Sequence, residues 1–448
     1  MAKLITLTLF FMSCLAGEGQ YPAHEVKEDL TYLQSQLETY HPGFYRYTSK
    51  MEMADAFEKA IANGGMSDLG LYANVKFLLG KIGCGHTRAQ MSDRMGRDIE
   101  LNQVFMPLTV KLIGEKVFID KTLDSQLQSG QEIISINGVS IQDIKKKIGN
   151  YIPSDGFIET GKLRMAELLF DGYYQLYVDP TARSYELKVK NELDEETVFT
   201  VGGVPNDQIE GIRKQYKGDL LSLEYSGDFA YMRIKTFGSQ SLQRDGYDYK
   251  KFLKTSFKEL KNKETANLIL DLRGNGGGRD NYGALLVSYL AKDSYGYFDN
   301  IQVTENYPGR STKVGNTYFM TSHEGLSVWQ PQKDRFNGDV YVLIDGFSFS
   351  TCADVATVLH HHGWATFLGE ETGGGYDGNT SGRSKSIILP NSKISVSIPM
   401  WMYTTANVGH AYMGRGVIPD YPVFTSWEEY VSGVDAVLEK AKSLIDSK

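Results

Sequence analysis

The pattern of apolar positions first predicts helices. From about residue 22 to residue 92, apolar residues recur every three or four positions, beginning with Val26, Leu30 and Leu33. This spacing is typical of helices that bury one face. The first helix should end before Pro42, because proline disfavours helical backbone in the residue that precedes it. We therefore expect a helical cap domain over residues 22–95.

The pattern changes to short strands near residue 102. A hairpin is expected to turn at Gly114 and another at Asn137-Gly138, since both sequences favour tight turns between apolar runs. A helix should follow from Gln142 to Ile148. Residues 100–203 are thus predicted to form a small β-rich domain with one or two helices, with strands at 108–113, 116–120, 132–136, 185–190 and 196–201.

Continuous apolar strands then alternate with amphipathic helices, over the domain expected at residues 204–448. This alternation predicts a mostly parallel sheet that is covered on both faces. A hairpin at 386–398 and a closing helix at 427–445 complete the chain. The strands are expected at 229–234, 267–271, 340–344 and 365–368, and the helices at 249–260, 281–291 and 351–361.

The N-terminus has the composition of an export signal. A short basic start at Lys3 precedes about a dozen apolar residues from Leu4 to Leu15, which suits a signal peptide over residues 1–17 and is too short to cross a bilayer. Lipidation of Cys14 is a second possibility, and a buried first strand or helix is a third. No other segment is predicted to span a membrane, so we expect a periplasmic or cell-surface protein.

Composition narrows the function further. The 448 residues include 47 Lys and Arg against 55 Asp and Glu, a formal net charge of −8, so the chain has no general means of holding nucleic acid. Hydrophobic residues make up 41%, enough to bury real cores. Three cysteines exclude a disulfide scaffold. Glycine is frequent, at 46 residues, which points to tight turns or close backbone approaches.

Two strand-to-helix turns are candidates for chemistry. The first is the glycine-rich sequence from Asp271 to Gly278, whose consecutive glycines would let backbone N–H groups point at an anion. It lacks both the dinucleotide-binding spacing and the lysine of a phosphate-binding loop. An ordinary tight turn is the alternative.

The second turn runs from Asp345 to Thr351 and also follows a buried strand. Ser350 would project from the sheet edge there, and the N–H of Thr351 would be a free donor at a helix start. One turn would thus supply both an oxygen nucleophile and an oxyanion donor. The alternative is structural, because Thr351 to Asp354 also has the pattern of a helix capping box.

A nucleophilic serine needs a base. His86 is a candidate, flanked by glycine at the end of the helical region, although a single histidine is also commonly structural. The run His360 to His362 suggests a metal, but adjacent side chains on a helix point in different directions. Since Gly363 ends that helix, a solvated helix terminus is favoured over a metal site. No metal and no cofactor are predicted.

These segments, in this order, resemble the C-terminal-processing and tricorn-type serine peptidases, in particular the branch that includes the interphotoreceptor retinoid-binding protein. The resemblance covers nearly the whole chain after the signal peptide. It implies an α/β fold with a crotonase-like (ClpP-like) core, an N-terminal helical cap and a PDZ-like module. The matching segments are Gly83-Cys-Gly-His86-Thr, Ser129-Gly-Gln-Glu-Ile-Ile-Ser-Ile-Asn-Gly, Asp271-Leu-Arg-Gly-Asn-Gly-Gly-Gly, Ser348-Phe-Ser350, Gly369-Glu-Glu-Thr-Gly-Gly-Gly375 and Gly416-Val-Ile-Pro-Asp420.

By position in these motifs, the resemblance implies that Ser350 is the nucleophile and His86 the base. The oxyanion hole would be formed by the N–H of Thr351 and that of Gly276 or Gly277. The third member of the triad is unassigned, because the residues that the family uses near the base are replaced. Gly375 stands where the processing branch has its lysine, Gly85 stands where the tricorn branch has a serine, and the glutamate expected before Gly416 is absent.

The sequence therefore predicts an exported serine peptidase that acts on peptide or protein substrates. A catalytically inactive relative that binds a peptide or another ligand is one alternative, and an exported serine esterase or transacylase is the other. Cys84 and Cys352 flank the expected site. A disulfide between them is conceivable in an oxidising compartment, but two buried thiols are favoured.

Overall fold

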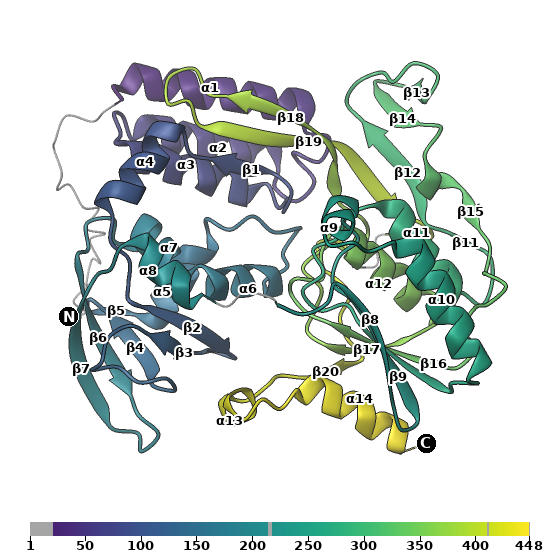
Figure 1. The fold of residues 1–448 in the computed structure, drawn as a ribbon. Coiled ribbons are helices and arrows are strands. Elements are labelled where there is room, and N and C mark those ends of the chain that lie inside the picture. The colour runs from purple at the N-terminus through teal and green to yellow at the C-terminus, as the bar shows by residue number, and fades with distance from the viewer. Residues whose placement is uncertain (1–20, 214–216, 410–411, 448) are drawn as a thin grey trace, which may run out of the picture.

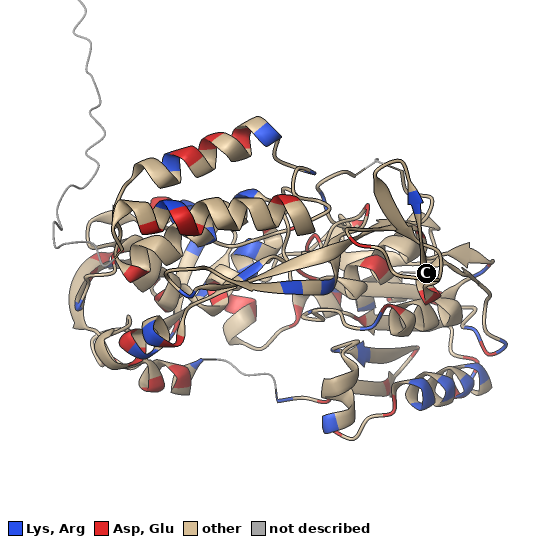
Figure 2. Ribbon diagram, turned by 90° about the horizontal axis from the view of Figure 1, so that it is seen from above, with Lys and Arg blue, Asp and Glu red and all other residues tan. Residues whose placement is uncertain are grey.

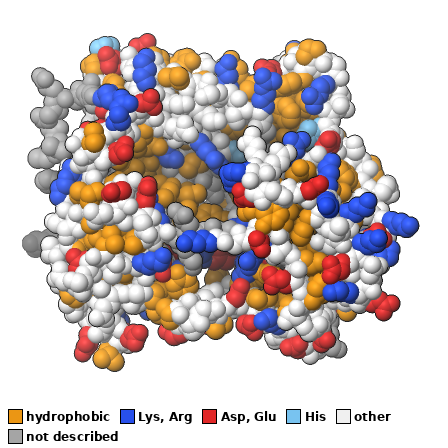
Figure 3. Space-filling model, in the orientation of Figure 1, with side chains coloured by type: hydrophobic (Ala, Val, Ile, Leu, Met, Phe, Trp, Pro, Cys, Tyr) orange, Lys and Arg blue, Asp and Glu red, His pale blue; other side chains and the backbone are white. Residues whose placement is uncertain are grey.

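The computed structural model describes residues 21–213, 217–409 and 412–447. The predicted signal peptide, residues 1–17, and Cys14 within it lie outside the described residues. Figure 1 shows three groups of elements: N-terminal helices, a β-rich middle part and an α/β core. Figure 3 shows that the surface of this side is hollowed near its centre, where the three groups meet.

The N-terminal helices are held together by apolar faces that the sequence pattern predicts. The first helix ends at Tyr40, just before Pro42. Ser49 and Glu52 form a reciprocal capping box that starts the second. The last helix was not predicted, and it buries only Met95. The elements are α1 (Ala23–Tyr40), α2 (Lys50–Ala62), α3 (Asp68–Lys81), β1 (Arg88–Gln90) and α4 (Asp93–Asn102).

A long hairpin from the C-terminal half of the chain packs on these helices. Its strands, β18 (Thr380–Ile388) and β19 (Ser395–Thr405), contribute Ile387 and Val396 to the same apolar cluster as the helices. β1 pairs antiparallel with β19, and Ala89 lies opposite Val396. Since β1 begins two residues after His86, this pairing fixes the His86 segment against the core.

The middle part is an antiparallel sheet in the order β2-β3-β4-β6-β7, with β5 beside β4. The predicted turn at Asn137-Gly138 is present, and both residues have positive φ. More helical segments cover this sheet than the one or two that we predicted. The elements are β2 (Leu108–Ile113), β3 (Lys116–Thr122), β4 (Glu132–Ile136), β5 (Val139–Ser140), α5 (Ile141–Gly149), α6 (Thr160–Leu168), α7 (Phe170–Tyr173), the π-helix η1 (Tyr174–Val178), β6 (Ser184–Lys190), β7 (Glu196–Gly202) and α8 (Asn206–Ile212).

The core contains a six-stranded sheet in the order β20-β17-β16-β10-β9-β8. All of its pairings are parallel except that of β8 with β9, as the alternation of strands and helices predicts. One face packs on the largest apolar cluster and the other on α14. The elements are β8 (Leu221–Ser226), β9 (Phe229–Ile234), α9 (Ser239–Arg244), α10 (Tyr249–Asn262), β10 (Asn267–Asp271), α11 (Asp280–Leu290), β16 (Asp339–Ile344), α12 (Thr351–His361), β17 (Thr366–Gly369) and β20 (Tyr421–Pro422).

The closing helix that we predicted at 427–445 is instead two helices, α13 (Trp427–Val431) and α14 (Ala436–Asp446). Gly433 breaks the helix with a φ of +72°, and the Asp435 side chain caps the start of α14 by accepting from Leu438 N–H. A second antiparallel sheet joins β19 to strands that were not predicted. The remaining elements are β11 (Tyr295–Gly296), β12 (Phe298–Val303), β13 (Ser311–Val314), β14 (Thr317–Met320), the 3₁₀ helix η2 (Glu324–Leu326) and β15 (Val328–Trp329).

Acidic and basic residues are mixed along the helices and loops rather than gathered in separate parts of the fold (Figure 2). Among the described residues, no helix combines the length and the apolar character that crossing a bilayer requires.

Candidate active site

The two candidate turns meet because their strands are neighbours. β10 and β16 pair in parallel, with Leu270 opposite Val342, so the segments that follow the two strands leave the sheet at the same edge. The N–H of Phe349 donates to the carbonyl oxygen of Asn275 at 3.0 Å. The glycine-rich turn and the turn that carries Ser350 therefore form one continuous surface above the sheet.

Ser350 lies in an unusual backbone conformation at the start of α12. Its φ is +57° and its ψ is −132°, and its side chain makes no capping hydrogen bond. A non-glycine residue with positive φ is strained and is held there by its surroundings. The capping-box alternative is therefore wrong: Thr351 Oγ1 instead donates to Gly278 O or Asp280 Oδ1, each at 3.1 Å.

The nearby Ser348 has a different environment. It is fully buried, and its hydroxyl donates to Leu272 O at 3.0 Å. Ser350 is partly exposed. Of the two serines in this turn, only Ser350 has a hydroxyl that a substrate can reach.

His86 lies beside Ser350. Its Nε2 is 3.1 Å from Ser350 Oγ, although the two residues are 264 positions apart in the chain. The ring of Phe349 stacks on the imidazole with centroids 4.5 Å apart. A Cβ atom at Gly85 would lie 2.7 Å from the Phe349 ring, so glycine at this position is what allows Phe349 to cover His86.

The backbone donors around Ser350 are not equivalent. Gly277 lies against Ser350: a Cβ atom there would be 2.7 Å from Ser350 Cβ and 2.9 Å from Thr351 N. Its own N–H, however, donates to Asn275 Oδ1 at 2.9 Å. Within the described part of the chain, the N–H groups of Gly276 and Thr351 have no hydrogen-bond acceptor. Of the two glycines that the sequence left open, Gly276 has the free donor.

Burial sets the charge of His86. Burial, together with smaller effects of Arg88 and His41, lowers the pKa of His86 to about 3. His86 is therefore neutral at pH 7, as a residue that accepts a proton must be. Its Nδ1 is buried and has no hydrogen-bond partner among the described residues.

Asp155 is a carboxylate near this ring that the sequence analysis missed. It lies in the loop between α5 and α6, where its Oδ1 accepts from Gly85 N–H at 2.8 Å and its Oδ2 from Gly375 N–H at 3.4 Å. Burial raises its pKa to about 6, and these two hydrogen bonds oppose the increase. No pattern in the sequence marks a lone aspartate in a loop, so only the fold could reveal it.

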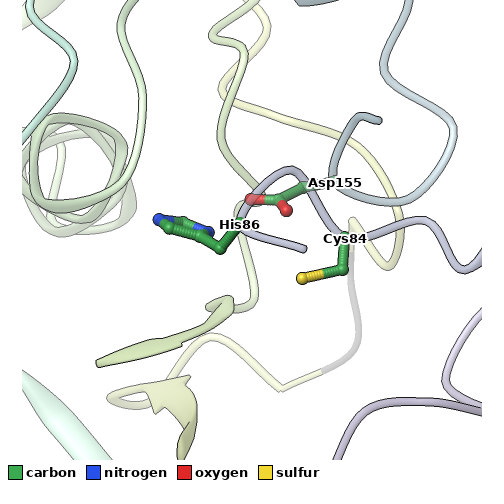
Figure 4. Close-up of side chains that lie close together, drawn as sticks. All are labelled: Cys84, His86 and Asp155. Carbon is green, nitrogen blue, oxygen red and sulfur yellow. The ribbon is translucent and has the colours of Figure 1, made fainter. Parts of the chain in front are cut away.

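Cys84, His86 and Asp155 each have one atom that could bind a metal ion, and these three atoms lie within 4.8 Å of one another (Figure 4). The described residues contain one such cluster. The Cys84 thiol donates to Thr380 O at 3.3 Å, and burial raises its pKa to about 12.

The other predicted features have structural surroundings. Cys84 and Cys352 are both free and buried, in agreement with the favoured prediction of two thiols. In the histidine run, His360 Nδ1 pairs with Tyr376 OH at 2.9 Å, and the His362 ring stacks on Trp364 with centroids 4.2 Å apart. These two histidines are therefore part of the packing at the end of α12.

A cleft of about 640 Å³ lies near the site. Part of its wall is His41, whose Nε2 is 3.0 Å from the hydroxyl of Thr87, the residue that follows His86. An ion pair between Arg46 and Asp377, 2.8 Å long, forms another part. The cleft runs between the end of α1 and the strands β12 and β14, and its wall also includes Pro42, Phe44, Gln302, Thr304, Tyr318 and Met402.

Comparison with known proteins agrees with this geometry. Residues 228–423 match the sequence model of Peptidase family S41. Mature CPAF, solved in complex with lactacystin, shares 15% sequence identity over 95% of this chain and 99% of its own, with a TM-score of 0.67. A protein from Parabacteroides merdae ATCC 43184 shares 18% identity over 95% of this chain and 99% of its own, with a TM-score of 0.50. At these identities the two structures show a shared fold, and the match to Peptidase family S41 over residues 228–423 agrees with the resemblance noted from the sequence motifs.

Proposed function

We propose that this chain, whose residues 228–423 match Peptidase family S41, hydrolyses peptide bonds with Ser350 as nucleophile and His86 as general base. The 3.1 Å contact between His86 Nε2 and Ser350 Oγ is the observation that carries the proposal. This distance is within the range in which a base can accept a hydroxyl proton.

The reaction would proceed in two halves. His86 Nε2 takes the proton of Ser350 as Oγ attacks the peptide carbonyl, and the carbonyl oxygen becomes an oxyanion held by the N–H groups of Gly276 and Thr351. His86 then gives the proton to the departing amine, which leaves an acyl group on Ser350. Water, activated by the same imidazole, releases the acyl group. The strained backbone of Ser350 fixes Oγ between base and donors.

The surrounding parts would serve this chemistry. We propose that the α/β core is crotonase-like and that the middle sheet is a PDZ-like module, which would bind an extended peptide by adding a strand. The helical part carries His86, and the cleft beside it would receive the chain of a peptide or protein substrate. We also propose export, with a periplasmic or surface location reached through residues 1–17.

One observation favours an inactive relative instead. His86 can accept a proton at Nε2 only when Nδ1 carries a hydrogen, and an orienting group normally holds that hydrogen. Among the described residues, Nδ1 of His86 has no hydrogen-bond partner. The experiment below decides between the two functions.

The test is hydrolysis of unfolded protein and of a peptide library, with the products identified by mass spectrometry. We expect cleavage by the wild-type protein and none above background from Ser350→Ala or His86→Gln. A short acyl ester assayed in parallel distinguishes a peptidase from an esterase. Binding of peptides without cleavage by the folded wild-type protein would contradict the proposal, and so would cleavage that survives Ser350→Ala.

A further inference from the structure

The imidazole of His86 has a partner at Nε2 and on one ring face, but none among the described residues at Nδ1. Nε2 faces Ser350 Oγ at 3.1 Å, and Phe349 covers a face of the ring. Nδ1 is buried without a hydrogen-bond partner. A buried polar atom that is left unpaired costs about 1–3 kcal/mol, so this atom requires an explanation.

The proton of a neutral histidine decides what the residue can do. His86 can accept a proton at Nε2 only when its own proton is on Nδ1. That tautomer buries an N–H donor, which needs an acceptor. The imidazolium formed during the reaction adds a positive charge to the same buried place, and a carboxylate would stabilise it far better than a neutral acceptor would.

Asp155 is placed to be this acceptor. One of its carboxylate oxygens lies within 4.8 Å of a His86 ring nitrogen, and Figure 4 shows the carboxyl group beside the ring. Its loop is tied to the His86 segment twice, by Gly85 N–H to Asp155 Oδ1 at 2.8 Å and by Gly156 N–H to Gly83 O at 3.0 Å. The two segments therefore keep their separation as one unit.

The geometry points to Asp155 as the positioning residue of His86: we propose that its carboxylate turns to accept the Nδ1 proton when a substrate occupies the site. This inference rests on the proposed function. The turn would give up the 3.4 Å hydrogen bond from Gly375 N–H, which is long and weak, and keep the 2.8 Å bond from Gly85.

Two other buried carboxylates near the site have partners of their own. Asp377 is paired with Arg46 through its Oδ2 at 2.8 Å, while its buried Oδ1 has no hydrogen-bond partner among the described residues. Asp354 accepts from Asn379 Nδ2 at 3.2 Å. Neither has a hydrogen bond to the loop that carries His86, whereas Asp155 has one to Gly85.

The pH response of the pair depends on all charged groups around it. Asp155 interacts with Arg46, Asp377, Cys84, Tyr47 and Asp354, and His86 with Arg88 and His41. A carboxylate beside an imidazolium raises the pKa of the imidazole. Its removal should therefore lower that pKa and move the acid limb of the activity profile to lower pH.

The kinetic test compares Asp155→Asn, Asp155→Glu and Asp377→Asn with the wild-type protein. Asp155→Asn should lower kcat by about 10²–10⁴-fold, change KM far less, and shift the acid limb of kcat downward. Asp155→Glu should recover part of kcat. Asp377→Asn removes an equally buried carboxylate that acts on Asp155 only through its charge, so it should move the acid limb much less than Asp155→Asn does. An Asp155→Asn protein with wild-type kcat and an unshifted acid limb would overturn the inference.

A second measurement does not depend on activity or on that variant retaining function. In Ser350→Ala protein labelled with ¹⁵N-histidine, an Nδ1 proton held by a carboxylate should give a low-field ¹H resonance, recorded with a bound peptide aldehyde or peptide substrate. The resonance should vanish when Asp155→Asn is added and persist with Asp377→Asn. Its persistence with Asp155→Asn, or its absence from the start, would refute the assignment. If the wild-type protein cleaves nothing while this signal depends on Asp155, the proposed function fails and the positioning contact stands.

Discussion

Gly277 offers a sharp test of the proposed oxyanion hole, because the space beside it is occupied by Ser350. In Gly277→Ala, the new methyl group would lie 2.7 Å from Phe349 O and Ser350 Cβ and 2.9 Å from Thr351 N. Real Cβ atoms are not found so close to other heavy atoms, so the Ser350 turn must move. The φ of +90° adds strain, about 1–2 kcal/mol for a residue with a side chain in the left-handed region.

The size of the expected loss of activity follows from the displacement of the Ser350 turn and of its backbone donor. Loss of one oxyanion donor costs about 10²–10³-fold in turnover, and a displacement of about 1 Å can cost about 10²-fold. We therefore expect Gly277→Ala to lower kcat/KM by about 10²–10³-fold. The rate of reaction with a fluorophosphonate probe should fall in parallel, while the protein unfolds at a slightly lower temperature.

Gly276→Ala is the matched comparison. It keeps the backbone N–H, and its Cβ would meet no atom within 4 Å, so it should lose much less activity. Both rates are measured by stopped-flow or time-resolved labelling, with thermal unfolding as the control for folding. A folded Gly277→Ala protein that reacts within about threefold of the wild-type rate would refute this account of the site.

Two further predictions concern stability. Burial lowers the pKa of His41 from 6.5 to about 3, so the unfolded state binds more protons between these pH values and stability falls as the pH falls. His41→Gln should reduce the slope of the unfolding free energy against pH by about 1.4 kcal/mol per pH unit, measured by urea unfolding between pH 4 and 7. Equal slopes for the variant and the wild-type protein would contradict the prediction. Arg46→Met should destabilise the protein by about 3–5 kcal/mol, because it leaves the buried Asp377 without its ion-pair partner. Adding Asp377→Asn should recover part of that loss in the same unfolding assay, and no recovery would show that the ion pair is not the cause.

The sequence predicted the core well where local pattern and packing agree. The strands β10 and β16 are continuous apolar runs, and such runs followed by glycine or serine turns can be recognised without a structure. The same pattern led to Ser350, and the ordered motifs led to His86. The long closing helix was wrong, because the apolar spacing continues across Gly433 while the backbone there does not.

What could not be predicted depends on contacts between distant segments. Asp155 has no motif around it and meets Gly85 only after the loop before α6 folds against the helical part. The choice between Gly276 and Gly277 depends on the hydrogen bond from Gly277 N–H to Asn275 Oδ1, which spacing along the chain does not reveal. The role of Gly85 likewise follows from the position of Phe349, which is far away in the sequence.

The central claim is that the hydroxyl of Ser350 is activated by His86. The most direct measurement is the site of covalent attachment of a fluorophosphonate probe to the wild-type protein, located by peptide mass spectrometry. The account predicts one adduct, on Ser350, that His86→Gln reduces strongly. An adduct on another residue, or no adduct on folded protein, would contradict it.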